Sequence, residues 1–171
     1  RALIAKVDPA DPRAGLVDTG LLVPHWPTPY GRGAGPVEQL VIDEELQRAA
    51  ISRPDIKIAG WAVPTIVFNG TDEQRERFVM PSLRGEITWC QLFSEPGAGS
   101  DLASLRTKAV RVPGGWELTG QKVWTSLAHQ AQWGITLART DAEVPQHKGI
   151  SYFLVDMASP GITIAPLREM T

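Results

Sequence analysis

The spacing of apolar residues changes about halfway along the chain, and its first half follows a helical period. In the segment PVEQLVIDEELQRAA, residues 36–50, the apolar residues Ile42, Leu46, Ala49 and Ala50 follow one another at intervals of four, three and one. This spacing places the four side chains on one face of an amphipathic helix. The segment therefore predicts a surface helix with one face against a core.

A second helix is predicted over TDEQRERFVMPSLRGE. Thr71 is followed three residues later by Gln74, which is the pattern of a capping box at a helix N-terminus. Pro81 lies inside the same segment and is expected to kink or split the helix. The chain up to about residue 86 is thus predicted to be helical.

The pattern beyond Gly85 is typical of short strands. Apolar runs recur as ITWCQLF, RTKAVRV, GWELTGQKVWT, WGITLART, GISYFLVD and GITIAPL, with turn residues such as Pro113-Gly114-Gly115 between them. Their spacing predicts a meandering antiparallel sheet or barrel. We therefore expect an α+β fold with a helical domain over residues 1–86 and an antiparallel β-barrel or sandwich-like domain over residues 87–171.

Composition and charge exclude several classes of protein. The chain has 171 residues, 43% of them hydrophobic and 21% charged, with a net charge of −2. This balance argues against nucleic-acid binding and against a polybasic membrane anchor. No apolar run approaches the roughly 20 residues that a membrane helix needs. The single cysteine, Cys90, excludes an internal disulfide and fits a cytoplasmic protein.

The histidines and the termini add two further expectations. His25, His129 and His147 are not spaced as metal ligands, so no metal site is predicted. The chain lacks a starting Met, which suggests a fragment or a processed piece of a longer protein.

One stretch, LFSEPGAGSDLAS at residues 92–104, places a flexible polar loop directly after a strand-like run. Gly97 and Gly99 have no Cβ to block the approach of an anion to the backbone N–H groups, and Ser94 and Ser100 add hydroxyls. The loop suits a phosphate-bearing ligand, although it is neither a P-loop nor a dinucleotide fingerprint. A hairpin turn with no ligand is the simpler interpretation of the loop by itself.

A second stretch, GQKVWTS at residues 120–126, carries Trp124 two residues before Ser126. In an extended strand these two positions face the same side. That face would offer an aromatic plane and a hydroxyl to a flat heteroaromatic ligand. The alternative is that Trp124 is a core residue.

Together, SEPGAGSDLAS and LTGQKVWTS resemble the motif pair of the acyl-CoA dehydrogenase family. GLLVPHWPTPYGRGAG, GTDEQRERFVMPSLRGE and HKGISYFLVDMASPGITI resemble further segments of that family, in the same order. The resemblance covers nearly the whole chain. It implies an FAD-dependent enzyme that oxidises an acyl-CoA thioester to the 2,3-enoyl-CoA. The FAD-contacting residues that it implies are Gln91, Phe93, Ser94, Gly99, Ser100, Trp124, Thr125 and Ser126.

The resemblance also implies a place for the main members of this set. Ser94 and the backbone beside it would meet the pyrimidine edge of the flavin, and Trp124 its dimethylbenzene side. Gly99 and Ser100 would lie near the diphosphate, with Ser100 also on the thioester arm of the substrate. Ser126 would approach the flavin N5, where the hydride arrives and negative charge gathers.

The catalytic base of the family is a Glu in a C-terminal helical domain, so we expect it beyond Thr171 and nominate no carboxylate within the chain. The 171 residues alone are expected to be inactive and to hold FAD weakly. The partners implied are an acyl-CoA substrate and an electron-transfer flavoprotein as electron acceptor. The full-length protein would be a homodimer or a tetramer.

Some residues depart from the family pattern. Phe93 stands where a smaller aliphatic residue is common, and Ser94 and Ser126 stand where Thr is frequent. The alternatives are a flavin monooxygenase or nitroalkane oxidase of the same fold, or a non-catalytic subunit that completes a partner's site. Straight-chain, branched and sterol-derived thioesters all remain open as substrates.

Overall fold

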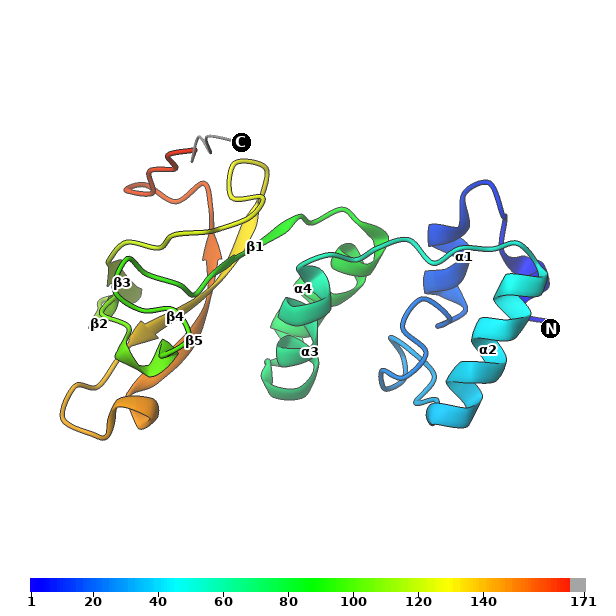
Figure 1. Cartoon of the computed structure of the whole chain (residues 1–171), viewed down its shortest axis with the longest axis horizontal. Coiled ribbons are helices and arrows are strands. Elements are labelled where there is room, and N and C mark those ends of the chain that lie inside the picture. Colours follow the sequence, from blue (N-terminus) through cyan, green and yellow to red (C-terminus); the bar gives the residue numbers. More distant parts are fainter. Residues whose placement is uncertain (167–171) are drawn as a thin grey trace. The chain divides into compact units, whose positions relative to one another are not determined.

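The computed structural model describes residues 1–166 (Figure 1). The chain divides into two compact units, one over Arg1–Ile87 and one that begins at Thr88. The first unit is helical and the second contains a sheet, so the predicted α+β class is confirmed. The cytoplasmic location stays a prediction. In the part of the chain that the structure describes, no helix has the length and apolar character needed to cross a membrane.

Four α-helices and a short 3-10 turn make up the first unit. They are η1 (Ile4–Lys6), α1 (Pro12–Asp18), α2 (Pro36–Arg48), α3 (Ala59–Asn69) and α4 (Asp72–Arg84). Helices α3 and α4 pack against each other across a two-residue connection. Val63 and Ile66 of α3 and Val79 and Leu83 of α4 are buried, so this pair supplies much of the core of the unit.

The capping box at the start of α4 is confirmed. The Thr71 hydroxyl accepts a hydrogen bond from the Gln74 backbone N–H at 3.2 Å, and the Gln74 side chain accepts one from the Thr71 N–H at 2.9 Å. Pro81 was predicted to kink or split the helix, and the split does not occur, because α4 continues through this residue to Arg84. Only one turn of helix follows Pro81, and the helix then ends at Gly85, whose φ of 79° is left-handed.

The apolar face predicted for helix α2 is only partly buried. Leu46 is buried, Ile42 and Ala49 are half-buried, and Ala50 is exposed. Ala50 lies just beyond the helix in a left-handed conformation, with φ 55°, so it no longer follows the helical period.

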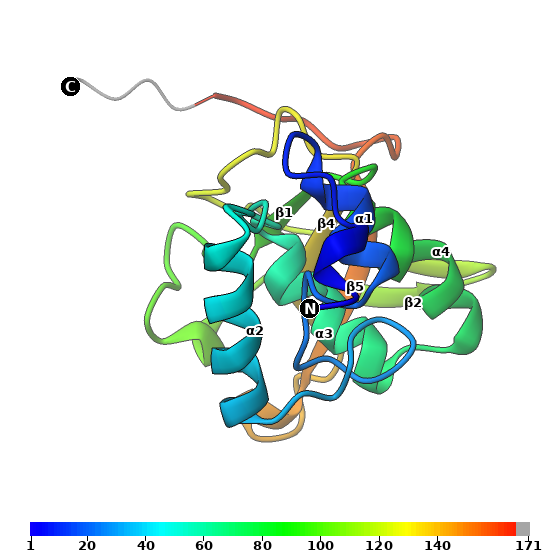
Figure 2. The ribbon, with the colours of Figure 1, turned by 90° about the vertical axis from the view of Figure 1, so that its right-hand side faces the viewer.

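The sheet of the second unit is built around one central strand. Its strands are β1 (Trp89–Leu92), β2 (Lys108–Val112), β3 (Gly115–Thr119), β4 (Trp133–Arg139) and β5 (Ile150–Asp156). Strand β4 pairs with β5 antiparallel along its whole length, and Figures 1 and 2 show these two strands side by side. It also pairs with β1 and, at one residue, with β2, both in parallel. Strands β2 and β3 form an antiparallel hairpin.

The sheet is therefore mixed, where a purely antiparallel meander was expected. Strands β1 and β4 run parallel because the long connection between them, which includes the β2–β3 hairpin, returns the chain to the end of the sheet at which β1 begins. Two predicted strand segments do not form. Residues 120–125 lie outside the sheet, and residues 161–166 contain no strand, while Leu167 lies outside the described residues.

The core of this unit lies along β1 and β4. Trp89, Cys90, Ile135 and Ala138 are almost entirely buried. The Cys90 Sγ lies 3.7 Å from the Met157 Sδ, and burial raises the pKa of its thiol to about 11. Cys90 therefore packs as a small apolar residue.

Candidate functional site

The loop after β1 begins with a tight turn. The Glu95 N–H donates to the Ala98 carbonyl at 2.8 Å, and the Ala98 N–H donates to the Glu95 carbonyl at 3.1 Å. Pro96 and Gly97 form the tip, and Pro is the residue most suited to the second position of such a turn. The hairpin turn considered from the sequence is thus present, and it does not by itself exclude a ligand.

The glycines of this loop border open space. A Cβ placed on Gly97 or on Gly99 would meet no atom within 4 Å, and neither residue has a positive φ. Neither internal packing nor backbone geometry therefore requires glycine at these positions. Open space beside an exposed backbone is compatible with the close approach of a bulky ligand such as a phosphate group.

The second motif lies against the first. The Val123 N–H donates to the Ser94 carbonyl at 2.9 Å. The Lys122 ammonium donates to the Phe93 carbonyl at 3.1 Å and to the Leu137 carbonyl of β4 at 2.8 Å. Residues 93–94 and 122–123 thus form one substructure, although they are far apart in the sequence.

A buried ion pair fastens this substructure. Lys122 Nζ lies 2.8 Å from Glu95 Oε1, and the two side chains are 8% and 7% exposed. The Glu95 carboxylate also accepts backbone N–H groups, from Arg106 at 2.6 Å and from Thr107 at 2.9 Å. Buried charges are tolerated when they are paired and hydrogen-bonded in this way.

The contacts around the pair determine its charge state. Burial alone would raise the pKa of Glu95, but the hydrogen bonds from Lys122, Thr107 and Arg106 outweigh it and lower the pKa from 4.5 to about 2. Burial lowers the pKa of Lys122 below its usual 10.5, although Glu95 counteracts this effect. Glu95 is therefore a carboxylate at neutral pH, and the three oxygen acceptors around Lys122 Nζ fit an ammonium.

The backbone at Trp124 contradicts the extended strand expected there. Trp124 has φ 59° and Leu127 has φ 66°, both in the left-handed region, so no strand places Trp124 and Ser126 on a common face. Such conformations are unfavourable for large side chains and tend to occur at functional positions. The Trp124 side chain is 70% exposed, which also contradicts a core role.

Thr125, like Thr136 of β4, has a buried hydroxyl without a partner among the described residues, and it lies next to Trp124 in the chain. Buried hydroxyls in folded proteins are nearly always hydrogen-bonded. An exposed indole next to an unsatisfied hydroxyl fits a flat polar ligand such as a flavin ring.

The remaining predicted residues surround these groups to different degrees. Gln91 lies half-buried on β1, opposite Ile135 of β4. The Phe93 ring stands edge-on to Tyr152, with centroids 6.5 Å apart. Gly99 and Ser100 are exposed beyond the turn. The structure thus brings Phe93 and Ser94 directly against the second motif. It places Gly99 and Ser100 further along the loop.

Sequence reasoning missed the role of Lys122. A lone lysine between Gln121 and Val123, in a run otherwise predicted as strand, was the available signal. Glu95 was not nominated as a base from the sequence, and its contacts with backbone N–H groups are those of a structural residue.

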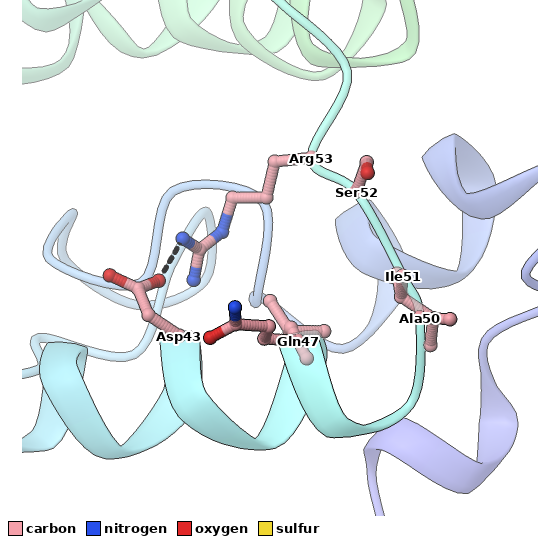
Figure 3. Close-up of a pocket in the computed structure, with 7 residues that line it drawn as sticks. Asp43, Gln47, Ala50, Ile51, Ser52 and Arg53 are labelled. Atoms are coloured by element: carbon pink, nitrogen blue, oxygen red, sulfur yellow. Dashed lines mark hydrogen bonds and ion pairs between the residues drawn. The ribbon is translucent and has the colours of Figure 1, made fainter.

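A separate depression of about 480 Å³ lies at the end of α2 (Figure 3). None of the predicted site residues lines it; the lining residues are Asp43, Leu46, Gln47, Ala50, Ile51, Ser52 and Arg53. Arg53 forms an ion pair with Asp43 and donates from Nε to the Leu21 carbonyl at 2.8 Å. The guanidinium charge is therefore neutralised within the unit, and we assign no ligand to this depression.

Comparisons with known proteins cover both units. Residues 5–86 match the N-terminal domain of acyl-CoA dehydrogenases, and residues 90–171 match the middle domain. The chain is 69% identical over 159 residues to the acyl-CoA dehydrogenase FadE34 of Mycobacterium tuberculosis, covering 93% of this chain and 22% of that protein.

Solved structures show the same likeness. The steroid ACAD Tcur3481-Tcur3483 matches with a TM-score of 0.73 and 38% identity, covering 91% of this chain and 40% of that one. The ChsE4-ChsE5 complex of Mycobacterium tuberculosis matches with a TM-score of 0.73 and 34% identity, covering 92% and 42%. The chain thus spans less than half the length of these relatives. With both of its units matched in order, the chain belongs to the acyl-CoA dehydrogenase family, of which it carries the N-terminal and middle domains.

Proposed function

We propose that the protein containing this chain is an FAD-dependent acyl-CoA dehydrogenase that converts an acyl-CoA thioester to the 2,3-enoyl-CoA. The observation that carries the proposal is the joining of the two family motifs into one substructure, through Lys122, Glu95 and the Val123–Ser94 hydrogen bond. The bound flavin would supply the oxidising power, since it accepts a hydride from the substrate.

The residues of this chain would bind and orient the flavin. Phe93 and Ser94 would lie along its ring system, and Ser94 would present hydrogen-bonding groups to the pyrimidine edge. The exposed Trp124 indole would cover the dimethylbenzene side, where it adds apolar contact and excludes water. The buried Thr125 hydroxyl would gain the partner that it lacks within the described residues.

Three further residues would act on the reacting end and on the diphosphate. Ser126 would place its hydroxyl near N5 and stabilise the charge that develops there. Gly99 would let the backbone approach the diphosphate, and Ser100 would contact both the diphosphate and the CoA thioester arm. Gln91 would complete the wall formed by β1.

No carboxylate of this site is suited to remove the substrate's α-proton. Glu95 is the buried carboxylate nearest to the predicted flavin contacts, and its pKa of about 2 makes it a poor base. Its two oxygens are also occupied by Lys122, Arg106 and Thr107. The proposal therefore places the base outside this chain.

The names of the relatives favour a bulky substrate and a multi-chain assembly. One solved relative is a steroid enzyme and another is a two-protein complex. We therefore propose a steroid-derived acyl-CoA as the substrate, with assembly into a dimer or tetramer and reoxidation by an electron-transfer flavoprotein.

The test is optical. The complete protein should be yellow when it is purified. Under anaerobic conditions, its flavin absorption bands should bleach when a suitable acyl-CoA is added. A panel of straight-chain, branched and steroid side-chain thioesters should bleach the flavin fastest with the steroid member. Purification without flavin, or bleaching by nitroalkanes and not by any thioester, would overturn the proposal.

A further inference from the structure

The Lys122 ammonium has three hydrogens, and each has a separate acceptor. The acceptors are the Phe93 carbonyl just after β1, the Glu95 carboxylate in the turn, and the Leu137 carbonyl of β4. A lysine ammonium has no further donor to offer. One side chain therefore connects the loop after β1, the segment before Trp124 and the central strand.

Glu95 extends the same connection to the start of β2. Its carboxylate accepts the backbone N–H groups of Arg106 and Thr107, eleven and twelve residues further along the chain. The loop over residues 95–107 is thus closed at its base by one side chain. The exposed Gly97, Gly99 and Ser100 lie within this closed loop.

We propose that Lys122 and Glu95 act as a positioning pair, which sets the geometry of the two segments that would contact the flavin, residues 93–100 and 123–126. This proposal rests on the function proposed above, although its first measurement does not need a flavin.

The geometry of the peptide bond gives the pair this role. The Phe93 carbonyl and the Ser94 N–H belong to one planar trans peptide unit, in which they point in opposite directions. When Lys122 holds the Phe93 carbonyl, it also directs the Ser94 N–H away from the ion pair. The orientation of a backbone donor at the predicted flavin edge is therefore fixed by a side chain that need not touch the flavin.

The same anchor acts on Trp124. A left-handed conformation at a tryptophan persists only when its surroundings hold it there. Lys122 is fixed by its three hydrogen bonds, and Val123 is fixed by the Ser94 carbonyl. The two residues that immediately precede Trp124 are thus both fastened to the first motif.

A buried ion pair is by itself weak evidence for a stabilising role. Replacing a buried ion pair by neutral groups of similar size is often neutral or stabilising, whereas removing one partner is strongly destabilising. This difference separates a positioning role from a structural one. The variants are Lys122→Met, the double variant Lys122→Met/Glu95→Gln, and the exposed-lysine control Lys108→Met.

The first measurement is hydrogen exchange of backbone amides in the complete protein. In Lys122→Met, the Val123, Arg106 and Thr107 amides should all exchange about 10-fold faster or more, because they share one network. Lys108→Met should leave them unchanged. Unchanged protection of Arg106 and Thr107 would overturn the proposal, whether or not the protein binds flavin.

The second measurement is FAD affinity at a temperature at which each variant is folded by circular dichroism. The double variant removes the uncompensated charge, so its stability should return towards the wild-type value. Its FAD dissociation constant should stay raised by about 10- to 100-fold, which is the loss of affinity typical when residues that orient metal ligands are removed. The visible flavin circular dichroism should change as well. Wild-type affinity in the double variant would show that the pair is structural only.

Discussion

Removal of the Lys122 ammonium should strongly destabilise the second unit, which contains the sheet and is called the β unit below. The loss of stability should depend on pH. Met at this position has nearly the length of lysine and leaves no large cavity. The Glu95 carboxylate would stay buried with only the Arg106 and Thr107 N–H groups to hold it, and the Phe93 and Leu137 carbonyls would lose a donor. Breaking a buried pair in this way costs about 3–5 kcal/mol in the free energy of unfolding at pH 7.

The pH dependence follows from the pKa of Glu95. In the wild type this pKa is lowered from 4.5 to about 2, so the carboxylate contributes about 3 kcal/mol of stability above pH 4.5. This contribution is lost as the pH falls from 4.5 towards 2. In Lys122→Met, burial dominates and the pKa of Glu95 rises, so acid relieves the buried charge. The difference in stability between wild type and variant should therefore shrink between pH 7 and pH 4.

Cys90 offers a probe that reports on this unit alone. It is the single cysteine of the chain, it is fully buried on β1, and its raised thiol pKa keeps it unreactive in the folded state. The protein is equilibrated in urea at each pH and then exposed to a brief pulse of N-ethylmaleimide at pH 7.5. Mass spectrometry of the Cys90 peptide gives the unfolded fraction. A difference below about 1 kcal/mol at pH 7, or one that is equally large at pH 4, would refute this reasoning; Lys108→Met is the matched control.

Four further predictions concern the two flavin-contacting residues Trp124 and Ser126, the closely packed Gly120, and Ala50 at the end of α2. Trp124→Ala should weaken FAD retention by about 1–3 kcal/mol and leave the rate of flavin reduction nearly unchanged, because an indole packed on a ring contributes in either redox state. Ser126→Ala should instead slow single-turnover flavin reduction by about 10- to 100-fold with little loss of FAD; reduction at the wild-type rate would remove Ser126 from the proposed mechanism. Gly120→Ala should destabilise the β unit by about 1–3 kcal/mol in the Cys90 assay, because the new Cβ would lie 2.2 Å from the Thr107 hydroxyl and 2.7 Å from its Cα. Ala50→Gly should stabilise the first unit by about 0.5–1 kcal/mol, since its φ of 55° suits glycine and its side chain is exposed; slower amide exchange at the end of α2 would show the gain, and faster exchange would contradict it.

Local patterns in the sequence were sufficient for α2, for α4 and for most of the strands. The capping box at Thr71 and Gln74 involves residues three positions apart, so both partners are visible in one short segment. Five of the six β-like runs form strands for a similar reason, because their apolar residues and turn signals are neighbours in the chain. The motifs SEPGAGSDLAS and GQKVWTS also identified the family, since they could be recognised without knowledge of how they meet.

The tertiary structure decided the features that depend on distant residues. The parallel pairing of β1 with β4, the pair Glu95–Lys122 and the left-handed backbone at Trp124 were not expected from the sequence. Glu95 and Lys122 are 27 residues apart, and Lys122 reads locally as part of a strand. Its burial is favourable only because three acceptors from separate segments converge on one ammonium. Hydrophobic period describes which side of an element faces the core, but it carries no information on which distant polar groups meet there.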